Sequence, residues 1–226
     1  MLRREDGTRQ TADFIITEAG RLQAEWVANH RLSAVGMPMP LPRDQGLHPV
    51  GCELQACTLS FRFEASRHAE LVCAEFQMQV EGWLVAGDSM IELQDHWRID
   101  TVPAEHEGLE RESHPRFHFQ RGGHAQTSFA GLNGFVPGLQ TPMSAGNWRG
   151  LMQYQGPRVP SLPFDPILAI DFCVAQNDGP LWTRLRNVPE YFNVVEAAQR
   201  RLWRPFLESM ATAEGRRRWL GALVTV

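Results

Sequence analysis

The sequence predicts one α+β domain spanning residues 1–226, with an N-terminal helix, a four-stranded antiparallel meander, a long Gly/Pro-rich loop and C-terminal helices. Three observations predict this class. Apolar residues recur at helical spacing near the start of the chain, alternate with polar residues between residues 53 and 120, and return to helical spacing after residue 164. Strands joined in sequence by short turns and followed by helices are typical of an antiparallel sheet with one face covered by helices.

The composition is that of an ordinary globular protein, with 43% hydrophobic and 21% charged residues. A domain of this length buries roughly 70% or more of its unfolded surface, so it needs no disulfide or metal ion to fold. The net charge of −4 gives no overall attraction to nucleic acid or to an anionic membrane. The sequence contains no run of about 18 apolar residues, so we expect no membrane-spanning helix.

The N-terminal residues and the cysteines indicate a cytoplasmic protein without a cofactor. The segment LRREDGTRQ after Met1 lacks the apolar stretch of a secretory signal, so we expect a reducing compartment. The cysteines show no CxxC spacing and no neighbouring His pair, which argues against a zinc site. The nucleotide-binding patterns GxGxxG and GxxxxGKS/T and the nucleophile pattern GxSxG are absent. The four cysteines are Cys52, Cys57, Cys73 and Cys173.

The first helix is predicted to start at the N-cap Thr11, after a mobile segment 1–10, and to run to about Ser33 before Gly36 ends it. Several prolines then make residues 35–50 an extended connector, whose apolar residues indicate that it lies on the body of the protein. The expected buried face of the helix consists of Ile15, Ala19, Leu22 and Trp26.

Four segments alternate apolar and polar residues and are predicted strands. These segments are 57–66, 71–82, 90–100 and 113–123. The pair Gly87-Asp88 between the second and third segments is typical of a tight hairpin turn. Asp95 lies on the apolar side of the third segment, which conflicts with burial of that side. In the last segment, Phe117 and Phe119 are expected to face the core.

The long loop 121–163 is rich in glycine and proline but also contains aromatic residues, so we expect much of it to be packed on the body of the protein. Asp165 followed by Pro166 predicts an N-capped helix, and residues 167–176 are apolar nearly all round, which predicts that this helix is buried. Pro189 begins another predicted helix. Its expected core face consists of Phe192, Val195, Gln199, Leu202 and Phe206.

The candidate site lies on the predicted strand 113–123, where His114, Arg116, His118 and Gln120 share one face. Two histidines four positions apart on a strand are separated by about 13 Å, at roughly 3.3 Å per residue. Two ligands that each lie about 2.1 Å from one zinc ion cannot span that distance. We therefore expect this pair alone to bind no metal ion, although either histidine could join His96 or His124 in a metal site.

A hairpin between the last two predicted strands suggests how the site is formed. If the hairpin is centred near residue 107, three polar pairs face each other: Asp100 with His114, Arg98 with Arg116, and His96 with His118. Opposed arginines repel each other unless an anion lies between them, so Arg98, Arg116 and His96 are the expected anion-binding residues. His114 and His118 are then a catalytic acid and base for a phosphodiester, with Asp100 orienting His114. The alternative is a solvent-facing sheet surface with ordinary histidines and arginines.

The order of elements and the pair His114-Pro115 resemble the ubiquitin-conjugating (E2) fold and its non-catalytic RWD relatives over about residues 11–210. Divergent prokaryotic members of this group occur in defence and ubiquitin-like conjugation operons. An active E2-like enzyme carries its cysteine shortly after the His-Pro pair, but here the next cysteine is Cys173. Arg116 replaces the usual Asn, and His-Pro opens the last predicted strand instead of following it. The resemblance therefore implies an inactive, partner-binding relative.

Two functions follow as hypotheses. The first is a non-catalytic protein-binding accessory of E2-like or RWD-like architecture, encoded in a bacterial defence or ubiquitin-like conjugation operon, which contacts its protein partner through loop 121–163. The alternative is an RNase-like enzyme or toxin that cleaves phosphodiesters on the His/Arg face of the sheet. A phosphate-containing ligand is expected in that case, and nucleic acid enters only as its substrate.

Overall fold

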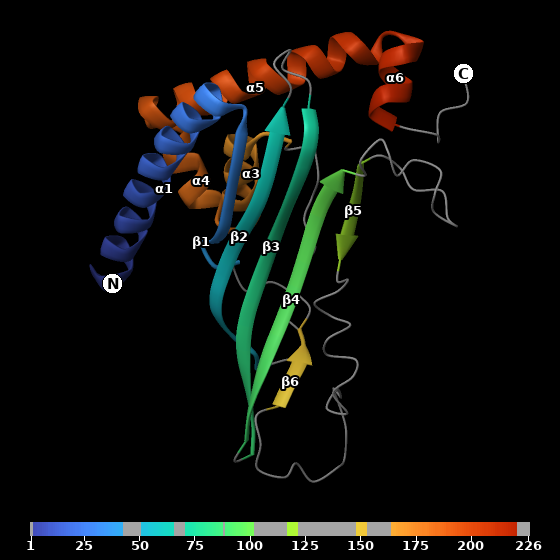
Figure 1. Cartoon of the computed structure of the whole chain (residues 1–226). Helices are drawn as coiled ribbons and strands as arrows, with labels where there is room; N and C mark the ends of the chain where they lie inside the picture. Colours follow the sequence, from blue (N-terminus) through green and yellow to red (C-terminus); the bar gives the residue numbers. More distant parts are fainter. Residues whose placement is uncertain are drawn as a thin grey trace, which may run out of the picture.

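A six-stranded sheet lies at the centre of the structure, with helices behind and around it (Figure 1). The computed structural model describes residues 2–42, 51–65, 71–87, 89–101, 117–121, 148–152 and 164–220. The strands are β1 (Arg31–Pro38), β2 (Glu53–Ala65), β3 (Leu71–Ala86), β4 (Ser89–Thr101), β5 (Phe117–Arg121) and β6 (Trp148–Leu151). The helices are α1 (Leu2–Asn29), α3 (Pro166–Asn177), α4 (Gly179–Arg186), α5 (Pro189–Met210) and α6 (Ala213–Leu220). This order confirms the predicted α+β class.

The sheet contains more strands than the four predicted. Five strands form an antiparallel meander in the order β1-β2-β3-β4-β5, and the short β6 pairs with β4 in parallel. Strand β6 lies inside the segment predicted as a loop. Ala86 pairs with Ser89 across the β3–β4 hairpin, and Gly87 has a φ of 61°. The predicted tight turn at Gly87 is therefore confirmed, and it needs a residue that tolerates positive φ.

Strand β1 lies where the sequence predicts the end of a helix followed by a connector. His30, with a φ of 54°, turns the chain from α1 directly into β1. The pairing with β2 shifts between Ala34 and Met37, and Gly36 within this shift has a φ of 66°. The Gly36 N–H donates to Ser60 Oγ at 3.0 Å. Glycine and proline are tolerated here because β1 lies at the edge of the described sheet and pairs with β2 on one side.

Helix α1 starts earlier and ends earlier than predicted. It begins at Leu2, so residues 2–10, assigned above to a mobile start, are helical, and Thr11 lies inside the helix. The helix ends at Asn29 instead of near Ser33. The predicted buried face is confirmed, because its four residues are at most 4% exposed: Ile15, Ala19, Leu22 and Trp26. The 3.6-residue period thus identified the packed face although it misplaced both ends.

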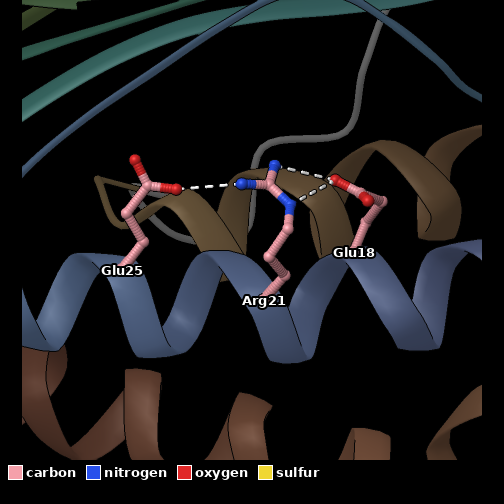
Figure 2. A network of polar contacts seen from close by, with 3 residues as sticks. All are labelled: Glu18, Arg21 and Glu25. Carbon is pink, nitrogen blue, oxygen red and sulfur yellow. Dashed lines mark hydrogen bonds and ion pairs between the residues drawn. The ribbon is translucent and has the colours of Figure 1, made fainter.

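The outer side of α1 carries a small ion-pair network, shown in Figure 2. Arg21 lies between Glu18 and Glu25 and makes ion pairs with both at 2.9 Å. The spacings are i,i+3 and i,i+4, at which side chains meet on a helix surface. Because these side chains are solvent-exposed, the network stabilises α1 only slightly.

The core lies between one face of the sheet and the helices α1 and α3, and α5 packs on these two helices. Strand side chains alternate between this face and the opposite one, as the sequence predicts. Phe76 and Trp97 on neighbouring strands meet edge to face at 5.5 Å, and Phe172 of α3 packs on both, at 6.1 and 5.6 Å. The largest fully buried strand side chains are Leu59, Phe63, Phe76, Met78, Trp97 and Ile99.

Asp95 is buried on the apolar side of β4, at 1% exposure, as its place in the alternation requires. The conflict noted in the sequence is resolved by Arg121 at the end of β5, whose guanidinium donates hydrogen bonds to both carboxylate oxygens of Asp95. A buried carboxylate is tolerated when a cation compensates its charge. No neighbour of Asp95 in the sequence could have revealed this partner.

Phe119 does not occupy the core in the way the sequence predicts. Its ring contacts Trp97 at 6.1 Å, but the residue is 44% exposed. The prediction of burial is wrong because β5 lies at an edge, next to β4, so that one side of the ring remains open to solvent. The side chain of Phe117 lies outside the described part of the chain.

Helix α3 confirms the prediction made from Asp165 and Pro166. Asp165 caps the helix, and its side chain accepts a hydrogen bond from the Ile167 N–H at 2.9 Å. Nearly every residue of the helix is buried, because it lies against the sheet. Within the described ranges, no helix is long and apolar enough to cross a membrane.

Two features of the C-terminal helices differ from the predictions. Helix α4 was not predicted, although Asp178 is followed by Gly179-Pro180 and caps the helix by accepting from the Leu181 N–H at 3.1 Å. In α5, Val195 is buried as predicted, but the predicted core residue Phe192 is 41% exposed. The fully buried residues of α5 are Tyr191, Val195 and Ala198.

Candidate functional site

Polar side chains line the face of the sheet opposite the core, and their strand register arranges them in rows, because directly paired residues share a face. One row, called here the Arg62 row, crosses five strands and consists of Ser33, Arg62, Glu75, Asp100 and His118. The next row, called the Arg98 row, consists of Ser60, Gln77, Arg98 and Gln120.

The register of β4 with β5 differs from the predicted hairpin. Asp100 lies opposite His118, not opposite His114, and the predicted pairing of His96 with His118 is wrong. The connection between these strands is longer than a tight turn, so its length does not determine the register. His114 lies outside the described residues, and His118 is placed by its backbone pairing.

Arg98 is held by groups of the protein itself. Its Nε lies 3.1 Å from Asp100 Oδ2 and donates to Gln120 Oε1 at 2.8 Å. Gln120, and not Arg116, is the residue opposite Arg98, so the predicted pair of opposed arginines does not occur in this register. Arg116 belongs to the segment that is not described. A guanidinium already paired with a carboxylate attracts a further anion less strongly.

His96 is placed on the same polar face but is 3% exposed. Gln79 lies opposite it on β3. The structure describes two of the predicted anion-binding residues. The guanidinium of Arg98 is already paired with a carboxylate, and His96 is buried.

A hollow of about 410 Å³ lies on the polar face across β1, β2, β3 and β4. Its lining includes members of both rows, namely Ser33, Arg62, Glu75 and Asp100 of the Arg62 row and Ser60, Gln77 and Arg98 of the Arg98 row. Arg62 is exposed, with Ser33 and Glu75 as its neighbours across the strands. Within the described ranges, no hydrogen bond or ion pair holds the Arg62 guanidinium. Of the two described arginines that line the hollow, Arg62 is thus the exposed one that no described group engages, whereas Arg98 is paired with Asp100.

The thiols are in environments that disfavour the reactive thiolate. Burial raises the pKa of Cys57 to about 12, and it raises the pKa of the fully buried Cys173 well above its usual value. Cys52 and Cys73 are half-buried, and burial followed by neighbouring carboxylates raises the pKa of each. Cys73 lies on the polar side of β3, as does Glu75.

The described polar face carries charged groups of both signs, with Arg62 and Arg98 beside Glu75 and Asp100. In the part of the chain that the structure describes, no three His, Cys, Asp or Glu side chains are close enough to hold a metal ion. Sequence reasoning missed Arg62 and Glu75 as site residues. The alternation places both on the polar faces of two predicted strands, but their proximity depends on how these strands pair.

No protein-family model, curated protein or solved structure matches the chain.

Proposed function

We propose that the chain is a non-catalytic, protein-binding accessory of E2-like or RWD-like architecture, which acts in the cytoplasm with partners of a bacterial defence or ubiquitin-like conjugation system. The observation that carries this proposal is the order of elements: α1 leads into four consecutive antiparallel strands, β1 to β4, and helices follow later in the chain. Because β1 belongs to the sheet, His114-Pro115 comes after the fourth strand of the meander, which is its place in the E2 family.

The state of the cysteines supports a non-catalytic role. A thioester-forming cysteine must be accessible and partly ionised. Cys57 and Cys173 are buried, and the pKa values of all four thiols are raised. None of these cysteines lies shortly after His-Pro in the sequence.

The open polar face supports a binding role. In Figure 1, helices lie behind, beside and above the sheet, and no described helix crosses its front. The surface predicted to contact the partner, loop 121–163, lies mostly outside the described residues. Its described part is packed on the body: Met152 is 3% exposed, its N–H donates to Gln94 O at 3.1 Å, and its Sδ lies 3.8 Å from Cys52 Sγ.

The test combines a binding assay with a thioester assay. Products of the genes adjacent to this one are purified and mixed with the wild type and with His118→Ala. We expect one of them to form a stable complex on size-exclusion chromatography with both proteins. We also expect no reductant-sensitive adduct when a ubiquitin-like protein, its activating enzyme and ATP are added. Absence of any complex would overturn the partner-binding role, and an adduct lost on a Cys→Ser substitution would overturn the non-catalytic role.

A second candidate function, phosphodiester cleavage, is favoured by one observation. In the register of β4 with β5, Asp100 is paired with His118, and a carboxylate is the group that orients a catalytic histidine in acid–base chemistry. The pairing of Arg98 with Asp100 disfavours this function, because Arg98 is the residue expected to bind the phosphate and its guanidinium already contacts a carboxylate. Cleavage of RNA or of a cyclic nucleotide by the wild type, lost in His118→Ala, would establish it; no cleavage would exclude it.

A further inference from the structure

The hollow on the polar face has the size of a small-ligand site. Its volume of about 410 Å³ lies in the range typical of such sites. Two oppositely charged side chains lie next to each other in its lining, because Arg62 and Glu75 are directly paired across β2 and β3. The other polar side chains that line it are Ser33, Ser60, Gln77, Arg98 and Asp100.

Arg62 provides the positive side of this site. A guanidinium binds a carboxylate through two parallel hydrogen bonds, and no group of the described chain engages Arg62 in this way. Ser33 is its other partner across the strands. Ser60, in the next row, accepts the Gly36 N–H through its oxygen, so its own hydroxyl proton remains a donor.

Glu75 provides the negative side. It is exposed, lies beside the weakly donating Cys73 thiol, and has Asp100 as its next neighbour across the strands. Glu75 attracts an ammonium group, whereas Asp100 is already paired with Arg98. The ligand that fits this lining therefore carries one carboxylate and one ammonium group.

The spacing of these charges limits the ligand further. Directly paired residues on neighbouring antiparallel strands have Cβ atoms about 4.5–5.5 Å apart. A free α-amino acid carries its carboxylate and its ammonium on the same carbon, so it can meet both side chains at once. We infer that the hollow binds a free α-amino acid, with its carboxylate on Arg62 and its ammonium on Glu75. This inference does not rest on the proposed partner binding.

Gln77 and Ser60 bound the hollow beside these two charges. An amide and a hydroxyl favour a ligand side chain that forms hydrogen bonds over an aliphatic one. Polar amino acids are therefore expected to bind more tightly than leucine or valine.

The test is isothermal titration calorimetry of the full chain with each of the twenty free amino acids. We expect at least one polar amino acid to bind with a Kd of about 1 mM or lower. Its N-acetyl derivative, which lacks the ammonium, and its amide, which lacks the carboxylate, should bind about ten- to a hundredfold more weakly, which corresponds to the loss of a hydrogen bond to a charged group. These comparisons use the wild-type protein and need no variant to fold.

Variants then test which residues hold the charges. Arg62→Gln should weaken binding about ten- to a hundredfold, whereas Arg31→Gln should leave it unchanged. Arg31 is a matched control, because it is exposed on the same face and pairs with Glu64 at 2.6 Å. Thermal unfolding of both variants checks that they fold. Binding by no amino acid, equal binding of the N-acetyl derivative or the amide, or undiminished binding by Arg62→Gln would each overturn the inference.

Discussion

Arg201 of α5 donates two hydrogen bonds, at 2.7 and 2.9 Å, to Asp165, the residue that caps α3. Asp165 is 2% exposed, and its other oxygen accepts the Ile167 N–H. Arg201 also donates to Gln23 of α1 at 3.0 Å. One buried carboxylate and its cation therefore join three helices that are far apart in the sequence.

Replacing Arg201 by Met should lower the free energy of unfolding by about 3–5 kcal/mol at pH 7, because Asp165 is left as a buried carboxylate without a cation. The measurement is urea unfolding. Arg200→Met is the matched control and should change little, since Arg200 and its partner Glu196 are exposed. Equal losses in the two variants would show that the pair with Asp165 contributes nothing specific.

The loss caused by Arg201→Met should depend on pH. Burial is the main reason that the pKa of Asp165 is raised above its usual value, and Arg201 acts against this rise. Without Arg201 the pKa rises further, so the folded variant holds a proton at a pH where the unfolded chain has released it. Stability is then higher below the folded pKa and falls as the pH rises through it. The difference from the wild type should therefore shrink between pH 7 and pH 4; a constant difference would contradict this account.

The four thiols should react in two classes with a thiol reagent at pH 8. Cys57 and Cys173 should remain unmodified until the protein unfolds, since they are buried and their pKa values are raised. Cys52 and Cys73 are half-buried and should react in the native state, more slowly than a free thiol because their pKa values are also raised. The measurement is the number of thiols modified over time with and without urea, and mass spectrometry identifies the sites. Rapid modification of Cys57 or Cys173 in the native state would contradict their burial.

Truncation of a phenylalanine should lower the free energy of unfolding more in the core than at the edge of the sheet. Phe76 is 1% exposed, and Phe76→Ala should cost about 3–5 kcal/mol because it leaves a core cavity. Phe119 is 44% exposed, and Phe119→Ala should cost about 1 kcal/mol, mainly through its contact with Trp97. Both values are obtained from denaturant unfolding. A loss for Phe119 as large as that for Phe76 would show that Phe119 is buried in solution.

Phosphate should not stabilise the fold through Arg98. A bound anion at a hundredfold excess over its Kd raises the free energy of unfolding by about 2.7 kcal/mol. Because Arg98 is already paired with Asp100, we expect equal thermal midpoints with and without phosphate at constant ionic strength, in the wild type and in Arg98→Gln. A phosphate shift in the wild type that disappears in Arg98→Gln and in Arg116→Ala would instead establish the anion site expected from the sequence.

Local signals in the sequence identified several elements correctly. The alternation of apolar and polar residues located β2, β3 and β4, since a half-buried strand requires it. Asp165-Pro166 identified the start of α3, because a side-chain cap and a proline in the first turn act within a few residues. Asp178 before α4 carries the same kind of signal, since it caps the helix and a proline follows in the first turn.

Strand β1 shows where local signals failed. Its glycine and its proline-rich surroundings indicate an irregular connector, but these residues become acceptable once the segment pairs with β2 on one side. Whether a segment is an edge strand depends on its neighbours in the sheet, which are not encoded in the segment itself. The four-strand prediction therefore missed β1 and also the short β6.

The sequence by itself determined the α+β class, the tight turn at Gly87, the cap of α3 and the set of residues on each face of the long strands. These features depend on backbone geometry and on side chains within a few positions of each other. Only the tertiary structure decided that Asp100 lies opposite His118, that Arg121 neutralises Asp95, and that Arg62 and Glu75 meet in one hollow. Strand register and ion pairing across the fold are long-range choices, set by the total burial and charge compensation of the folded chain.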